Sequence, residues 1–259
     1  GVDVEQCNEY SKKKVELRQA LLDEYKLSTN TCVLGIVSRF EKFKGIEKTI
    51  EALSLISNVK WHLFIAGSGP EKNSILCKLK NYLNTEQYTV LGQLNIKQSL
   101  RLIASLDYLL NLSLEFSRKS GNEAYIHTET MGRSMIEAVC CKTPIIATNV
   151  GGISELFLEQ GKIGIILEKN KLLAKEIEKM IRKKADVFVK EIEKYDWTYI
   201  FDNLYVNLMS IEEKYHHNIN LIIDLEGSII HDFCSEEINR QNLERILSLS
   251  NICNVIINT

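Results

Sequence analysis

The chain has 259 residues, 45% of them hydrophobic, so it can bury the core of one large domain or of two small ones. Its formal net charge of −2 gives no electrostatic basis for binding nucleic acid or an anionic membrane surface. No stretch approaches the roughly 20 apolar residues of a membrane-spanning helix, and no signal peptide opens the chain.

The seven cysteines form no C-x-x-C pair, and several lie inside apolar stretches. An odd number of scattered thiols favours reduced, buried cysteines over a disulfide framework or a zinc site. This usage indicates a cytoplasmic protein without a bound metal.

Short apolar runs alternate with amphipathic segments along most of the chain. A helix is predicted for residues 9–25, and residues 31–38 are apolar throughout, as in strands buried on both faces of a parallel sheet. Further strands are expected at 61–66, 88–91, 108–112, 143–148 and 164–167, and helices at 46–56, 97–105, 154–158, 170–184, 186–193 and from Trp197. This order predicts an α/β fold with a Rossmann-like, doubly wound parallel sheet.

The loops after the strands of such a sheet gather at one rim, where ligands bind. The loop 39–45 brings two cations, Arg39 and Lys44, to a strand end. Gly67 and Gly69 form a tight turn that would let the backbone approach a ligand closely. Solvated loop charges and a plain turn are the alternative interpretations.

Two acids, Glu129 and Glu137, lie eight positions apart with Gly132 between them. Glu137 lies in the apolar segment 135–139, spaced like one face of a helix, where a buried acid needs hydrogen-bonding partners. The start of that helix would offer free N–H groups to a phosphate. This pattern suits a phosphorylated, sugar-containing ligand, although surface acids without any such role are common.

Taken together and in order, these stretches resemble the C-terminal, donor-binding domain of the group 1 glycosyltransferases. These are retaining, nucleotide-sugar-dependent enzymes with two facing Rossmann-like domains (the GT-B fold) and an E-x7-E motif. The resemblance covers about residues 1–210, and the matching stretches are 35–46, 63–70, 90–93 and 129–155. It implies sugar transfer from a nucleoside diphosphate sugar to an acceptor, with retention and without a metal or other cofactor.

The resemblance also implies roles for individual residues. Arg39 and Lys44 would hold the donor diphosphate, Glu129 would contact the transferred sugar, and Glu137 would bind the ribose hydroxyls. The remaining implied substrate-binding residues come from the glycine turn, the base pocket and the helix start: Gly67, Gly69, Leu91, Gly92, Met131, Gly132 and Arg133. No catalytic base is implied within this chain.

The chain departs from the family's pattern in two places. Met131 stands where an aromatic residue is usual, and Arg133 where an apolar one is usual. Arg133 would add a phosphate or acceptor contact, or be exposed. The polar stretch 113–128, longer than the family's usual link, would be a specificity loop, a lid or a surface insertion.

Near residue 218 the pattern restarts, with strands expected at 219–224 and 252–257 around a helix at 235–249. Residues 221–228 resemble the first motif of haloacid-dehalogenase-like (HAD) phosphatases, with Asp224 as the nucleophile. Because Glu226 replaces the acid/base aspartate of those enzymes, we expect no phosphate hydrolysis from this segment. We predict two domains, 1–217 and a partial HAD-like unit at 218–259.

The sequence therefore predicts the donor-binding half of a glycosyltransferase. The acceptor-binding N-terminal domain is expected to be missing, so this chain would bind the donor and transfer nothing. Two alternatives remain, namely a bifunctional glycosyltransferase–phosphatase similar to sucrose-phosphate synthases, and a non-catalytic nucleotide-sugar-binding module. We expect no nucleic-acid partner, and charge gives no support for membrane association, although lipid-linked acceptors at the inner membrane face occur in the family.

Overall fold

The computed structural model describes residues 1–120, 123–130, 132–160, 163–167, 173–183, 191–215, 219–224, 240, 244 and 253–258. Its internal contacts divide the chain into two compact units, residues 5–191 and residues 1–4 together with 192–259. The backbone N–H of Val2 donates to the Tyr195 carbonyl at 2.9 Å, and that of Val4 to Asp196 Oδ2 at 3.2 Å. These bonds group the first residues with the C-terminal unit, whereas a domain boundary at 217/218 stays a prediction.

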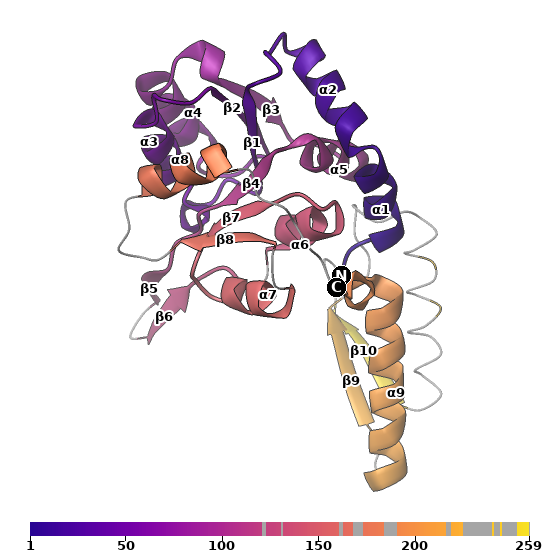
Figure 1. Ribbon diagram of the computed structural model, residues 1–259. Helices are drawn as coiled ribbons and strands as arrows, with labels where there is room; N and C mark the ends of the chain where they lie inside the picture. The colour runs from indigo at the N-terminus through magenta and orange to yellow at the C-terminus, as the bar shows by residue number, and fades with distance from the viewer. Residues whose placement is uncertain are drawn as a thin grey trace. The chain divides into compact units, whose positions relative to one another are not determined.

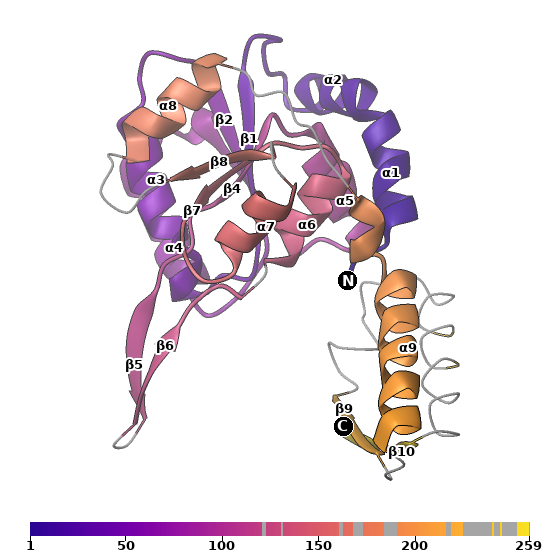
Figure 2. The same cartoon turned by 60° about the horizontal axis from the view of Figure 1, so that its bottom comes forward.

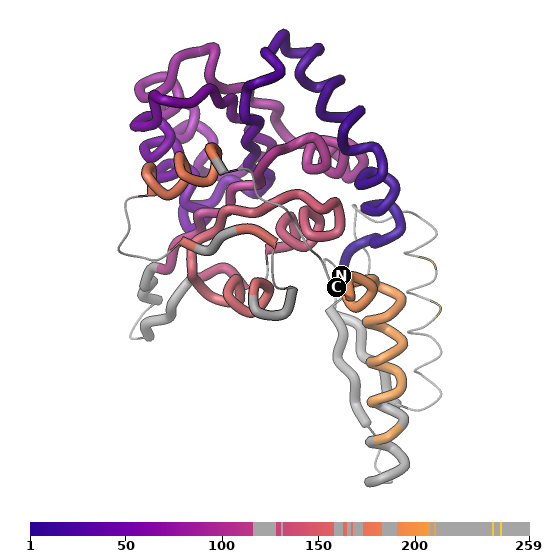
Figure 3. Tube along the Cα trace, in the orientation of Figure 1, coloured from indigo at the N-terminus to yellow at the C-terminus, as the bar shows by residue number. Residues whose placement is uncertain are grey.

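Six parallel strands form the sheet of the larger unit, in the order β3-β2-β1-β4-β7-β8 (Figure 1). The strands are β1 (Cys32–Val37), β2 (Trp61–Ala66), β3 (Tyr88–Gly92), β4 (Tyr108–Asn111), β7 (Ile145–Thr148) and β8 (Gly164–Leu167). The chain proceeds from β1 outward to β3 and then returns to the other side of β1 with β4, a path that Figure 3 traces. The predicted doubly wound parallel sheet is therefore confirmed, with a topological switch point between β1 and β4.

Helices pack on both faces of this sheet (Figures 1 and 2). One face carries α3 (Ile46–Ser54), α4 (Lys72–Tyr82) and α8 (Leu173–Lys183). The other carries α2 (Lys14–Glu24), α5 (Ile96–Ser105) and α6 (Arg133–Cys140). The remaining helices of this unit are α1 (Val4–Lys12) and α7 (Ile153–Gln160).

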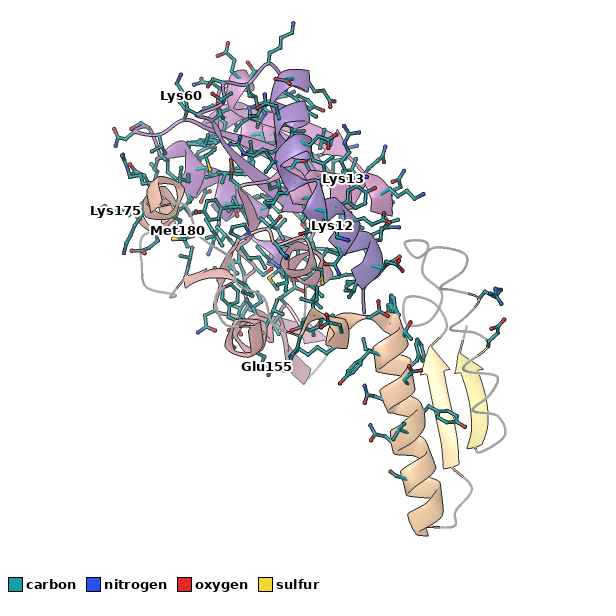
Figure 4. All side chains as sticks on the ribbon, turned by 45° about the vertical axis from the view of Figure 1, so that its right-hand side comes forward. Lys12, Lys13, Lys60, Glu155, Lys175 and Met180 are labelled. Atoms are coloured by element: carbon teal, nitrogen blue, oxygen red, sulfur yellow. The ribbon has the colours of Figure 1, made fainter. Side chains whose placement is uncertain are left out.

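The central strands are buried on both faces, which explains their unbroken apolar sequences. All six residues of β2 are buried. Helix α8 turns the exposed Lys175 outward and the buried Met180 inward (Figure 4), and the Met180 carbonyl accepts a hydrogen bond from the Tyr108 hydroxyl at 2.9 Å. This bond fastens β4 to the helical layer beside it.

Two sequence predictions for the larger unit are wrong. The helix expected at 9–25 is two helices, because the chain turns at Lys13, where the backbone N–H donates to the Tyr10 carbonyl at 3.1 Å. The turn lets Lys14 Nζ donate to the Thr143 hydroxyl at 2.7 Å and the Leu106 carbonyl at 3.3 Å. Within the stretch expected to be a loop, β5 (Phe116–Ser120) pairs antiparallel with β6 (Glu123–His127).

The smaller unit contains α9 (Trp197–Tyr215), β9 (Ile219–Asp224) and β10 (Cys253–Asn258). The two strands pair in parallel, with Asp224 opposite Asn258 at their carboxyl ends. Both strands were expected, and the predicted bounds of β10 begin and end one residue before the observed ones. The helix predicted at 186–193 falls largely outside the described residues, and so do Glu226 and most of the helix predicted at 235–249.

Candidate functional site

β1 and β4 lie side by side at the switch point, and the chain leaves their carboxyl ends toward opposite sides of the sheet. The loop after each strand carries a charged side chain. Lys44 closes the short 3₁₀ helix Lys42–Lys44 after β1, and Glu129 follows the β5–β6 hairpin after β4. Lys44 Nζ forms an ion pair with Glu129 Oε2. The two side chains are only 16% and 6% exposed, so this pair is held largely out of water. The structure thus brings together two residues that lie 85 positions apart.

Two polar residues at the end of β4 complete this arrangement. The Ser113 hydroxyl lies 2.6 Å from Asn111 Oδ1 and 3.2 Å from Glu129 Oε2. Asn111 and Ser113 are both buried. Neither was singled out in the sequence, although an asparagine that interrupts an apolar strand is a signal of a polar site, because buried polar groups need partners.

Close contact between backbones fixes the position of these loops. Gly45 has φ +63°, and a Cβ there would lie 2.0 Å from the Leu112 carbonyl oxygen. Leu114 N–H donates to the Phe43 carbonyl at 2.6 Å. Lys44 is therefore held against the exit of β4 by a position that glycine alone fits.

The loop after β7 packs against the backbone of Glu129 and Thr130. Gly152 N–H donates to the Glu129 carbonyl at 3.1 Å, and a Cβ on Gly151 (φ +53°) would lie 1.8 Å from that oxygen. A Cβ on Gly152 would lie 1.9 Å from the Thr130 carbonyl. Gly151 and Gly152 therefore let the loop after β7 pack directly against the backbone of the loop that carries Glu129.

Helix α6 begins beside the ion pair. Gly132 precedes its first residue with φ +62°, and no side chain caps this end. A Cβ on Gly132 would lie 2.5 Å from Met135 Cε and 3.1 Å from Asn111 Nδ2. The first-turn N–H groups of a helix have no intrahelical partner, and they favour anions. Met131, also predicted here, lies outside the described residues.

Glu137 lies one turn inside α6 and is 5% exposed. Burial raises its pKa to about 7, and the nearby Arg133 cation opposes that rise. Arg133 Nε lies 3.3 Å from Glu137 Oε1, and the arginine side chain is 32% exposed. The two predicted residues therefore contact each other along one face of the helix.

The other predicted residues lie around this centre without a recorded contact to it. The Arg39 side chain is 74% exposed and pairs with Glu41 at 3.1 Å. Cβ atoms on Gly67 and Gly69 would lie 1.9 Å from the Ser38 carbonyl and 2.5 Å from the Phe40 carbonyl. These two glycines therefore let the loops after β1 and β2 interlock.

The end of β3 is more open. Gly92 has φ +72°, no atom lies within 4 Å of where a Cβ on this residue would be, and Leu91 is partly exposed. The Gly92 carbonyl accepts a hydrogen bond from Gly67 N–H at 2.7 Å. Gly92 thus lies at an open position, and its part in a base pocket stays a prediction.

Within the described part of the chain, no cluster of three or more histidine, cysteine or acidic residues could hold a metal ion. None of the helices in the same residues is both long and apolar enough to cross a membrane. Asp224, the predicted phosphatase-like nucleophile, ends β9, but its side chain and the loop after it lie outside the described residues.

Comparison with known proteins identifies relatives of this chain. N-acetyl-alpha-D-glucosaminyl L-malate synthase of Bacillus anthracis is 31% identical over 150 residues, 57% of this chain and 35% of that protein. A probable sucrose-phosphate synthase of Thermosipho melanesiensis is 29% identical over 180 residues, 68% of this chain and 40% of that protein. The chain spans less than half the length of these two relatives.

A solved structure has the same fold. Anabaena HepE in complex with UDP and glucose matches with a TM-score of 0.62 at 22% identity, over 81% of this chain and 55% of that one. The sequence model of the family "Glycosyl transferases group 1" matches residues 18–195. Because that match spans well over half of the 259 residues, the chain belongs to the glycosyl transferases group 1 family.

Proposed function

We propose that this chain is the donor-binding half of a retaining, metal-independent glycosyltransferase whose donor is a nucleoside diphosphate sugar. The observation that carries the proposal is the buried Lys44–Glu129 ion pair at the switch point, next to the uncapped start of α6. A cation and a helix N-terminus are groups that bind a diphosphate, and a carboxylate accepts hydrogen bonds from sugar hydroxyls.

Each residue has a definite task in this proposal. Lys44 neutralises charge on the diphosphate as the sugar leaves, and the N–H groups of Arg133 and Ser134 at the start of α6 bind the same anion. The N–H of Met135 donates instead to the Gly132 carbonyl at 2.8 Å. Glu129 orients the transferred sugar and Glu137 binds the ribose. Arg39, exposed beside Glu41, would have to turn toward the diphosphate to contribute.

Calorimetric titration with UDP, GDP and ADP, with and without EDTA, tests the proposal directly. One of the three nucleotides should bind, and chelation should leave its affinity unchanged. Lys44→Ala should weaken that binding by about 10- to 100-fold, as expected for loss of a charged contact. Lys42→Ala is the matched control, since Lys42 is exposed two residues away and should leave the affinity within about twofold.

Catalysis would need an acceptor-binding half as well, and this chain matches only 35% and 40% of the length of two relatives. We therefore expect the chain by itself to bind nucleotide and to transfer no sugar from the matching nucleotide sugar. A non-catalytic binding module predicts the same absence of transfer. Affinity that is insensitive to both Lys44→Ala and Glu129→Gln would place the nucleotide elsewhere and overturn the proposal.

A bifunctional protein is the second candidate, and it rests on the parallel β9–β10 pair with Asp224 at the carboxyl end of β9. Nucleophiles of α/β folds occupy such strand ends. Hydrolysis of p-nitrophenyl phosphate that Asp224→Asn abolishes would support it, whereas the expected result is no hydrolysis.

A further inference from the structure

Glu137 is a carboxylate within a buried, mainly apolar stretch of α6. Its neighbours along α6, Met135, Ile136, Ala138 and Val139, are all buried, and Glu137 itself is 5% exposed. Removing a carboxylate from water favours its neutral form unless a cation or hydrogen-bond donor compensates. The charge state of Glu137 is therefore decided by its few polar neighbours.

Those neighbours come from α6, from the residue that follows it and from α1. From α6 itself, Arg133 places its Nε 3.3 Å from Glu137 Oε1. Cys141, the residue after α6, interacts electrostatically with Glu137. From α1, the negative charge of the Cys7 thiolate raises the pKa of Glu137. Hydrogen bonds from Cys140 and Cys141 lower the pKa of Cys7 itself to about 5. Lys14 of α2 interacts electrostatically with Cys141, and this interaction raises the pKa of Lys14. Among the described residues, Arg133 is the cation for which a contact with Glu137 is recorded.

The charge on Glu137 matters for the ligand assigned to it. An ionised carboxylate accepts from both hydroxyls of a vicinal diol, whereas a protonated carboxyl turns one oxygen into a donor. A ribose offers two neighbouring hydroxyls that can both donate. Recognition of the diol is therefore stronger with the ionised form, which can accept from both hydroxyls.

We propose that Arg133 is a positioning residue that keeps Glu137 ionised and so sets the pH range in which the chain recognises the ribose of its donor. This inference rests on the proposed function. It gives a role to Arg133, which stands where the glycosyltransferase family usually has an apolar residue. The pKa of about 7 for Glu137, which burial raises and Arg133 opposes, places the transition near neutral pH.

The test is calorimetric titration with UDP and with 2′-deoxy-UDP between pH 5.5 and 9. The wild-type chain should prefer UDP above pH 7 and lose that preference below it, by up to tenfold for each pH unit. In Arg133→Leu the midpoint of this loss should move upward by about one pH unit or more, as removal of an adjacent opposite charge requires. Arg133→Lys should restore a midpoint near that of the wild type.

Controls separate a charge effect from a structural one. Arg182→Leu removes the cation of another i,i+4 pair, with Glu178 at 2.7 Å, and should leave the midpoint unchanged. If Arg133→Leu does not fold, Arg133→Gln removes the charge with a polar side chain and carries the same expectation. Circular dichroism establishes that each variant is folded.

The outcomes distinguish the two proposals. If the wild-type chain binds UDP and 2′-deoxy-UDP equally at every pH, or if Glu137→Gln leaves the preference intact, the ribose assignment in the proposed function is wrong. If the wild type prefers UDP but the charge-removing variants keep its midpoint, Arg133 does not control Glu137 and only the present inference is overturned.

Discussion

Replacing Glu137 by glutamine should stabilise the ligand-free chain relative to the wild type, by an amount that grows as the pH rises. The pKa of Glu137 is raised by burial from 4.5 to about 7, so between these values the folded chain holds a proton that the unfolded chain has released. The free energy of unfolding of the wild type therefore falls through this window. At about 1.4 kcal/mol per pH unit, the fall is about 3 kcal/mol.

Glutamine has nearly the same shape and does not titrate, so the variant lacks this fall. The free energy of unfolding of Glu137→Gln, minus that of the wild type, should grow by about 3 kcal/mol between pH 4.5 and pH 8. Urea unfolding at four pH values measures the difference. The chain has two tryptophans, and Trp61 is buried at the start of β2 in the larger unit. Trp197→Phe in both proteins leaves Trp61 to report on that unit.

A matched control is Glu178→Gln on α8. The hydrogen bond from Arg182 lowers the pKa of Glu178, so its stabilising contribution is lost only as the pH falls below about 4.5. The free energy of unfolding of Glu178→Gln, minus that of the wild type, should change little between pH 4.5 and pH 8. If the Glu137→Gln difference is equally flat, Glu137 keeps an ordinary pKa and the argument from its burial is refuted.

Two further predictions concern positions around the site. Gly151→Ala should lower the free energy of unfolding by about 2 kcal/mol or more in urea titrations, because a Cβ at φ +53° would meet the Glu129 carbonyl oxygen at 1.8 Å. Burial lowers the pKa of Lys14 to about 8 from 10.5, so the wild type should gain about 3 kcal/mol of stability between pH 8 and pH 10.5. Lys14→Met should lack that gain, and an unchanged gain in the variant would assign it to other groups.

The strands were the most predictable part of the fold. Residues 61–66, 164–167 and 219–224 are strands with the expected bounds, because each is a short, mainly apolar run of the length typical of a strand. The break at Lys13 was not predictable from periodicity. The break depends on the hydrogen bonds that Lys14 donates to the Thr143 hydroxyl and the Leu106 carbonyl. Both partners lie far along the chain from Lys14.

The β5–β6 hairpin was missed for the opposite reason. Period-two alternation identifies a strand when one face is buried and the other is solvated. The stretch 116–127 is polar over much of its length, and its strands pair with each other rather than with the main sheet. Polar composition therefore favoured a loop, whereas pairing between two local segments needs no core-facing pattern.

For the site, sequence order identified the charged residues but not how they are connected. Lys44 and Glu129 were predicted from separate loops, and the switch point joins them. Asn111 and Ser113 were overlooked, because the sequence does not show which side chains return to the end of β4, although a buried asparagine there requires partners. The Gly67–Gly69 turn was predicted for a ligand, yet its glycines are required by the loop after β1.

These contacts divide the rim into two kinds of position. Gly45, Gly67 and Gly151 are fixed by backbone oxygens within 2.0 Å of where a Cβ would be, so they hold the loops in place whatever ligand binds. Chemistry then falls to the charged residues, and Lys44 and Glu129 largely neutralise each other before any ligand arrives. A bound diphosphate would compete with Glu129 for Lys44, and the sugar's hydroxyls would replace the lysine as partners of the carboxylate. The pair therefore favours a ligand that carries both groups, a diphosphate and a sugar, over a free anion, which would leave Glu129 buried without its cation.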